Sequence, residues 1–238
     1  MKRYISYSAI LALVLTSALV FFNQCSMGDT TRVTIQLKPN QQALKHNENQ
    51  WLSKIFYIFY KKAYAFTVWD SVRNEVLVVI EGSDMTTIEV SIPPLQTSYT
   101  IEVPSGSQRI FSVYGINTDN SQGKNWGGKV ITDLPPGADT TINIYMIPLP
   151  TEITPSLAAG IRLTWYAPSG IQGYYIYRAT NLNGPYIKIA TITTPATEQF
   201  DDLDPELVMD STYYYKISCY NANGESAPSD PVIQLYNP

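Results

Sequence analysis

The sequence predicts an all-β protein built from two β-sandwich domains. Three observations carry this prediction: short runs in which apolar and polar residues alternate, turn-forming residues between these runs, and a composition rich in residues that favour strands. Tyrosine occurs 18 times, beside 16 prolines and 13 glycines, and these residues favour strands separated by frequent turns. The pattern contains no regular strand–helix alternation, which disfavours a doubly wound parallel sheet.

The first predicted sandwich covers residues 25–148, in which the apolar residues of each expected strand share one face. The denser run EVLVVIEG at 75–82 predicts a central strand that is buried on both faces. Proline and glycine pairs separate the runs and predict turns. The alternating runs are found at Val33–Leu37, Ile88–Ile92, Tyr99–Val103, Phe111–Val113 and Ile142–Met146.

One stretch of this domain, NQWLSKIFYIFYKKAYAF at 49–66, departs from the β pattern. Trp51, Ile55 and Phe59 recur every four residues, which predicts a short helix, although IFYIFY is also compatible with a strand. The overlapping segment 45–62 holds four lysines and one acidic residue, a formal charge of +3. Aromatic residues flanked by lysines suit a helix that lies on a membrane surface. Alternatively, the segment covers the open end of the first sandwich.

Residues 149–154 form the expected linker between the domains, and the prolines in and beside it predict an extended connection. The second predicted sandwich follows at 155–238. Its first strand, IRLTW at 161–165, alternates so that three apolar residues lie on one face. Turn signals then recur about every 8–12 residues, a spacing typical of a sandwich.

The order W…GYYIYR…NGPYIKI…YYYKISCYNANGESAPS in this second domain resembles that of fibronectin type III domains, especially those of bacterial extracellular proteins. The resemblance implies structural roles for Trp165, as the tryptophan of the second strand, and for Leu207. It also implies that Tyr213 is the tyrosine corner, whose hydroxyl bonds to upstream backbone. Such domains act as spacers or binding modules, so recognition is expected in loops such as 117–126 and 221–228.

Three aromatic residues suggest a second kind of recognition. Tyr175 and Tyr177 have the opposite parity to Tyr174, so they are expected on the outer face of their sheet. Together with Trp126, they would support a glycan-binding accessory module if their rings were exposed to stack on sugars. Alternatively, the tyrosines cover the sheet against neighbouring side chains.

An acidic cluster near the end of the chain raises the question of a calcium site. Its carboxylates could attract Ca²⁺, but their spacing lacks the glycine turn of a dedicated calcium loop. The pattern therefore favours a solvated corner. The cluster consists of Asp201, Asp202, Asp204 and Glu206.

The N-terminus has the pattern of an export signal. Met1-Lys2-Arg3 is basic, and the following stretch 5–22 contains no charged residue. The position of Cys25 resembles the cysteine of bacterial lipoprotein signals, which is diacylated before the signal is cut. The resemblance implies a signal peptide at 1–24, a lipid on Cys25, and attachment in the bacterial cell envelope, on the outer membrane rather than the inner. The alternative is an uncleaved single-helix anchor, since the apolar run is long enough to span a bilayer.

The sequence offers few residues for catalysis. His46 is the only histidine, and the two cysteines, Cys25 and Cys219, lie far apart, so the three or four ligands of a zinc site are not evident. No phosphate-binding glycine loop or nucleophile elbow occurs. The formal charge of −4 supplies no basic field for nucleic acid. A glycan hydrolase would need two converging carboxylates in a cleft, and the acidic residues are scattered.

We therefore expect a non-catalytic display, binding or adhesion protein, held on a membrane through Cys25, that uses no cofactor and no metal. Its partner would be a protein or a polysaccharide. Three alternatives remain at this stage: a glycan-binding accessory protein, a glycan-active hydrolase, and a single-helix-anchored component of a periplasmic assembly.

Overall fold

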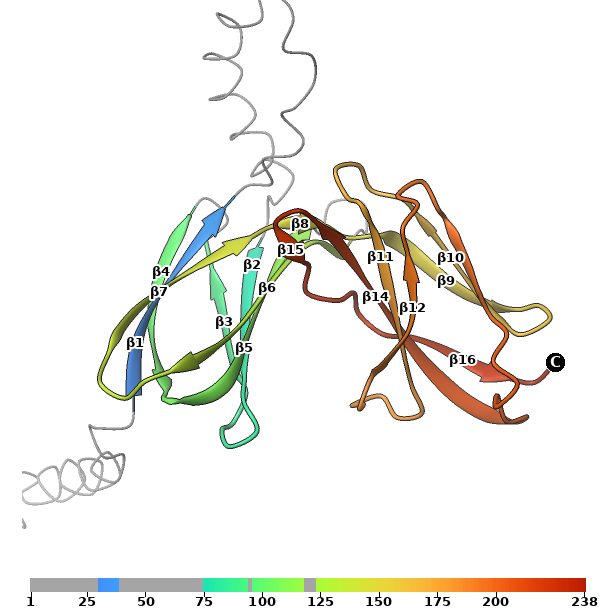
Figure 1. The fold of residues 1–238 in the computed structure, drawn as a ribbon, viewed down its shortest axis with the longest axis horizontal. Coiled ribbons are helices and arrows are strands. Elements are labelled where there is room, and N and C mark those ends of the chain that lie inside the picture. The colour runs from blue at the N-terminus through green and yellow to red at the C-terminus, as the bar shows by residue number, and fades with distance from the viewer. Residues whose placement is uncertain (1–29, 39–74, 94–95, 118–122) are drawn as a thin grey trace, which may run out of the picture.

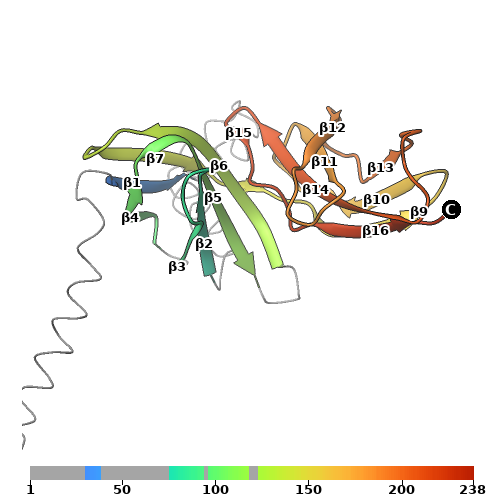
Figure 2. The same ribbon diagram turned by 90° about the horizontal axis from the view of Figure 1, so that it is seen from below.

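The computed structural model describes residues 30–38, 75–93, 96–117 and 123–238 (Figure 1). Within these ranges the elements are sixteen strands and no helix, which confirms the all-β prediction. The strands form two sandwiches that lie end to end, as Figures 1 and 2 both show. The helix predicted at 49–66 falls outside the described residues.

The N-terminal sandwich consists of a three-stranded sheet in the order β4-β1-β7 and a five-stranded sheet in the order β3-β2-β5-β6-β8. Most neighbours are antiparallel, but β1 and β7 run parallel, in register from Arg32 opposite Asp139 to Lys38 opposite Tyr145. The strands are β1 (Thr30–Lys38), β2 (Glu75–Glu81), β3 (Ile88–Ile92), β4 (Ser98–Pro104), β5 (Gly106–Asn117), β6 (Gly123–Leu134), β7 (Asp139–Tyr145) and β8 (Ile147–Pro148).

Alternating apolar residues from the two sheets meet in the core of this sandwich. Val33 and Ile35 of β1 face Val76, Val78 and other residues of the opposite sheet, and all four are fully buried. The opposite face of β2 is half-buried, because Leu77 and Val79 pack towards the C-terminal domain. The strand expected to be buried on both faces is thus fully buried on one only.

The C-terminal sandwich consists of a sheet in the order β13-β10-β9 and a second sheet in the order β12-β11-β14-β15, with β16 also paired to β14. Strand β14 is the long central strand, and its antiparallel neighbours are β11 and β16. The strands are β9 (Thr151–Leu157), β10 (Ile161–Tyr166), β11 (Gly173–Ala179), β12 (Ile187–Ile192), β13 (Gln199–Asp202), β14 (Ser211–Asn221), β15 (Gly224–Glu225) and β16 (Val232–Tyr236).

The core of the C-terminal sandwich follows the parity of its strands. On β14, Tyr213, Tyr215, Ile217 and Cys219 all point inward and are buried. They meet the inward residues of β10, among them Trp165, whose ring lies 5.2 Å from that of Tyr174. Burial of these large side chains is the main favourable contribution to the stability of the domain.

The connection between the domains is ordered. The backbone of Ile147 pairs with Gly127 of β6, while its side chain belongs to the core cluster of the C-terminal domain. The next two residues stay close to the N-terminal domain, and the amide of Leu149 donates to the carbonyl of Asn125 at 2.9 Å. Strand β9 then begins at Thr151, so residues 151–154, four of the six residues expected to form a linker, belong to a strand.

Candidate functional site

The site residues expected from the sequence lie in different places. Cys25 lies outside the described residues. Trp165 and Tyr213 are both buried in the core of the C-terminal sandwich, and Leu207 is half-buried against the same core. Within the described residues, no helix is long and apolar enough to cross a membrane.

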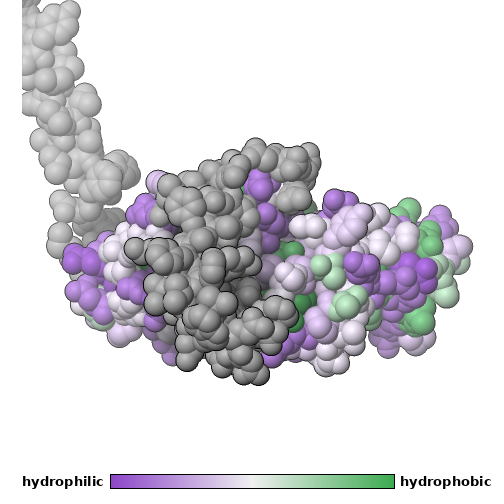
Figure 3. Space-filling model, turned by 90° about the horizontal axis from the view of Figure 1, so that it is seen from above, coloured by the Kyte–Doolittle hydropathy of each residue, from purple (hydrophilic) through white to green (hydrophobic). Residues whose placement is uncertain are grey.

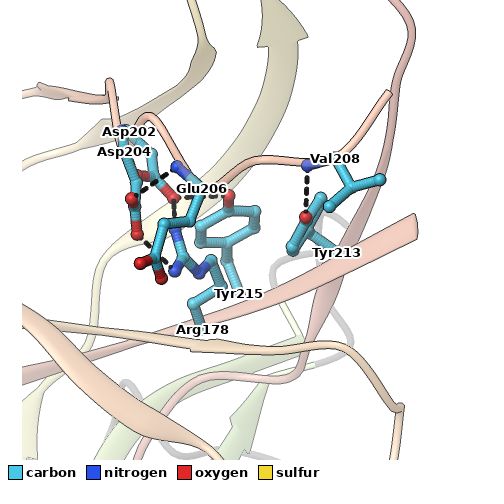
Figure 4. Close-up of polar contacts among 7 residues, drawn as sticks. All are labelled: Arg178, Asp202, Asp204, Glu206, Val208, Tyr213 and Tyr215. Atoms are coloured by element: carbon cyan, nitrogen blue, oxygen red, sulfur yellow. Dashed lines mark hydrogen bonds and ion pairs between the residues drawn. The ribbon is translucent and has the colours of Figure 1, made fainter. Parts of the chain in front are cut away.

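Tyr213 fastens the loop between β13 and β14 (Figure 4). The backbone N–H of Val208 donates a hydrogen bond of 2.8 Å to the Tyr213 hydroxyl oxygen. The loop thus turns back onto the strand that follows it. This is the geometry of a tyrosine corner, in which a core aromatic ring holds a chain reversal through its hydroxyl.

We expect Tyr213→Phe to lower the free energy of unfolding of the C-terminal domain by about 1 kcal/mol, because the change leaves the Val208 N–H without its acceptor. Tyr166→Phe serves as the control, since the Tyr166 side chain is exposed. Urea denaturation of both variants measures the difference. Equal midpoints for the two variants would refute this role of the hydroxyl.

The acidic cluster lies beside this corner, where it is bonded to arginine (Figure 4). Arg178 donates to Asp202 at 2.8 Å and to Asp204 at 2.6 Å, and the buried Tyr215 hydroxyl donates to the same Asp202 oxygen at 2.8 Å. Arg162 binds Asp201 through two hydrogen bonds. Three of the four carboxylates are therefore neutralised by guanidinium groups, which the solvated corner expected from the sequence did not include.

These contacts leave the cluster poorly suited to a cation. The described residues contain no group of three His, Cys, Asp or Glu side chains placed to hold a metal ion. The backbone N–H of Glu206 and the Arg178 guanidinium lower the pKa of Asp204, and Arg162 lowers that of Asp201. Two carboxylates held ionised by arginine also lack the proton that a glycosidase acid must donate.

The lowered pKa values predict a loss of stability in acid. A carboxyl whose folded-state pKa lies below its ordinary value of 3.8 contributes stability above that pH and loses it as the pH falls through the folded value. We therefore expect the urea midpoint to fall as the pH drops below about 4. The dependence should be shallower in Asp201→Asn, and an equally steep fall in that variant would rule out this contribution of Asp201.

The outward tyrosines of the C-terminal sheet are in contact with neighbouring side chains. Tyr175 stacks on Tyr220 with ring centroids 4.6 Å apart, and the Lys188 ammonium lies 4.3 Å from the Tyr175 centroid. The Tyr177 hydroxyl donates to Glu225 at 2.6 Å. Trp126 is half-buried against the N-terminal core. Of the two alternatives, these contacts favour tyrosines that cover the sheet. They disfavour a flat, exposed platform for sugars.

A separate group of residues from the two domains meets at the domain junction. We name as the junction cluster the buried residues Tyr114, Leu149 and Ala227 with the half-buried residues Leu77, Val79 and Ile116. An ion pair closes its edge: the Lys124 ammonium lies 2.6 Å from Asp230 and 4.4 Å from the centroid of the Tyr114 ring. Burial, together with the nearby charge of Asp230, raises the pKa of Tyr114 to about 12.

The junction uses part of a loop that was expected to recognise a ligand. Ser226 and Ala227 of loop 221–228 are fully buried, and a Cβ on Gly127 of the other domain would lie 2.9 Å from the Ala227 carbonyl oxygen. The second half of this loop is therefore engaged inside the molecule. The sequence signal that could have revealed this is the apolar Leu149 within an apparent linker.

The cysteine among the described residues is not suited to act as a nucleophile. Cys219 is free and fully buried, and burial raises the pKa of its thiol. A buried, protonated thiol is chemically inert. His46 and Cys25 lie outside the described residues.

The strand order, the tyrosine corner and the tryptophan in the core together place the C-terminal domain among the immunoglobulin-like β-sandwiches. In these domains such residues support the fold. Within that class, the C-terminal domain is fibronectin type III-like.

Comparison with known proteins gives the following similarities. No family model matches the chain, and no curated protein matches it. Among solved structures, a Fn3-like protein from Clostridium thermocellum is 32% identical over 35% of this chain and 86% of its own, with a TM-score of 0.31. The FN1–FN3 domains of chicken CNTN1 are 15% identical over 69% of this chain and 56% of their own, with a TM-score of 0.30. A segment of two fibronectin type III domains from chicken tenascin is 14% identical over 68% of this chain and 84% of its own, with a TM-score of 0.30.

Proposed function

We propose that the protein is a non-catalytic binding module displayed on a membrane of a bacterial cell envelope. The observation that carries the proposal is the junction between the two sandwiches, where an apolar cluster, an ion pair and a shared strand residue join the domains into one arm. An arm of this kind presents its far end at a fixed orientation. Fibronectin type III-like sandwiches are usually non-catalytic, which agrees with this role.

The proposed attachment point is Cys25, which follows the apolar segment 5–22 after two polar residues, and this segment is itself preceded by basic residues. Acyl chains on this thiol would contribute about 0.8 kcal/mol per buried CH₂ group, and two or more chains hold a protein stably on a membrane. The arm would then project from the membrane through the residues that precede β1. A partner protein or polysaccharide would be bound beyond the attachment point.

The test is metabolic labelling with a palmitate analogue, followed by membrane fractionation. We expect the wild type to be labelled and membrane-bound, and Cys25→Ser to lose the label. Cys219→Ala is the matched control, because its thiol is buried in the core and should not affect labelling. An N-terminal peptide that still begins at Met1 in the membrane fraction would contradict lipidation and would favour the single-helix anchor.

A further inference from the structure

The end of the C-terminal domain that lies away from the junction exposes large apolar side chains. Leu203, Val208 and Met209 are each 61% exposed, and Leu157 is 40% exposed. Figure 3 shows hydrophobic residues gathered at this end of the molecule. We name as the distal tip the turn 157–160 together with the loop 203–210. Isolated exposed apolar residues are common, whereas several on adjoining loops mark an interaction surface.

The two parts of the distal tip form one held surface. The Leu203 Cδ2 atom lies 3.2 Å from the point where a Cβ on Gly160 would stand, so the loop and the turn are in contact. The Asp210 amide donates to the Tyr236 carbonyl oxygen at 2.8 Å, which fixes the end of the loop against β16. The Val208 amide is held by the tyrosine corner. The apolar side chains therefore project from an anchored backbone.

The distal tip is also acidic. No lysine or arginine occurs between residues 193 and 215, and the whole segment 151–238 holds nine acidic and four basic residues, a formal charge of −5. The nearby arginines are already bonded to Asp201, Asp202 and Asp204. Glu206 and Asp210 take part in no ion pair among the described residues. A partner that covers the apolar side chains would therefore meet uncompensated negative charge.

A segment of the same chain is complementary to this acidic, apolar surface, because it is basic and rich in apolar residues. Segment 49–66 combines a dense run of aromatic and aliphatic residues with Lys54, Lys61 and Lys62, and it contains no acidic residue. Two distal tips would repel each other, because both are acidic. The strands that flank the segment belong to the N-terminal domain, on the far side of the junction from the distal tip.

We propose that the distal tip binds segment 49–66 of a second copy of this chain. Leu203, Val208 and Met209 cover the aromatic residues of the segment, and the free carboxylates Glu206 and Asp210 pair with its lysines. The contact joins two different surfaces, so it links copies either head to tail in a series or reciprocally in a closed pair. This self-association goes beyond the proposed function and does not depend on lipidation of Cys25.

The first test measures binding of a fluorescent synthetic peptide with the sequence 49–66 by anisotropy. The receptor is the full chain in detergent micelles, with its own lysines 54, 61 and 62 changed to glutamate so that it cannot compete. Empty micelles are the blank. We expect saturable binding that weakens at least tenfold in Leu203→Ser/Met209→Ser and in Glu206→Lys/Asp210→Lys.

Charge exchange makes the test specific. A peptide in which the three lysines are glutamate should bind Glu206→Lys/Asp210→Lys and should not bind the unaltered tip. Glu89→Lys/Glu198→Lys is the matched control, because it changes two exposed acidic residues outside the distal tip. Unchanged urea midpoints establish that each variant is folded. Equal peptide binding by tip variants and control, or no binding above the empty micelles, would overturn the proposal.

Sedimentation of the full wild-type chain in micelles distinguishes contact between copies from contact within one. We expect the protein mass per particle to rise with concentration, and to remain that of one chain in the Glu206→Lys/Asp210→Lys variant. A wild-type mass of one chain at every concentration, with the peptide still bound at the tip, would assign the segment to its own chain and overturn contact between copies.

Discussion

Arg109→Ala is expected to lower the free energy of unfolding of the N-terminal domain by roughly 3–5 kcal/mol. Arg109 is only 1% exposed and is the largest fully buried side chain of the described residues. Its Nε donates to the Pro104 carbonyl oxygen at 3.0 Å, and its guanidinium also binds the Ser105 carbonyl oxygen and Asp84. Truncation would leave a cavity and remove the donor from both carbonyl groups.

The surroundings of Arg109 are shaped to its guanidinium. A Cβ on either Gly82 or Gly106 would overlap this group, so both turns depend on glycine to accommodate it. Hydrogen exchange of the β5 amides, followed across a urea series, measures the loss of stability in this domain.

Arg32→Ala is the control for Arg109→Ala, because Arg32 forms only exposed ion pairs with Glu102 and Asp139. Such pairs contribute between about zero and 1 kcal/mol. If Arg109→Ala proved as mild as Arg32→Ala, the buried guanidinium would not be the support of these turns.

The second large effect is expected in the other domain. Trp165→Ala should lower the free energy of unfolding of the C-terminal sandwich by roughly 3–5 kcal/mol, because it empties a core position between the two sheets. Tyr166→Ala is the control, since the adjacent side chain points outward and is 61% exposed. Exchange protection of the β14 amides should fall in the first variant and persist in the second. Equal loss in both would contradict the core role of Trp165.

The alternation of apolar residues was sufficient to predict the two-sandwich architecture and many of the strands, but it missed β6, which begins inside the segment 117–126 that was expected to be a loop. Ile161, Leu163 and Trp165 share one face in the sequence and are buried together in the structure. Alternation follows from local strand geometry, so it carries no information about which strands pair. The parallel pairing of β1 and β7 joins residues more than a hundred positions apart, and no local pattern signals it.

The buried polar contacts were less accessible to sequence reasoning. A charged residue such as Arg109 is expected at the surface, and only the arrangement of two glycine turns creates an interior place for it. The junction was missed for a similar reason, because Leu149 lies in a segment whose prolines suggested a free linker. The sequence showed the acidic residues as a cluster. It did not show their partners, because Arg162 and Arg178 lie on other strands.

The parallel pairing of β1 and β7 also determines how the arm would resist a pulling force. If the chain is held before Thr30 and pulled at its far end, the load enters β1 at its beginning and leaves β7 at Tyr145. Because the two strands run in the same direction, these forces act in opposite senses along one axis and shear the ladder. The hydrogen bonds of all seven paired positions then bear the load at once instead of opening one by one. Resistance to such a force is a matter of unfolding rate, so the N-terminal sandwich should unfold slowly under tension.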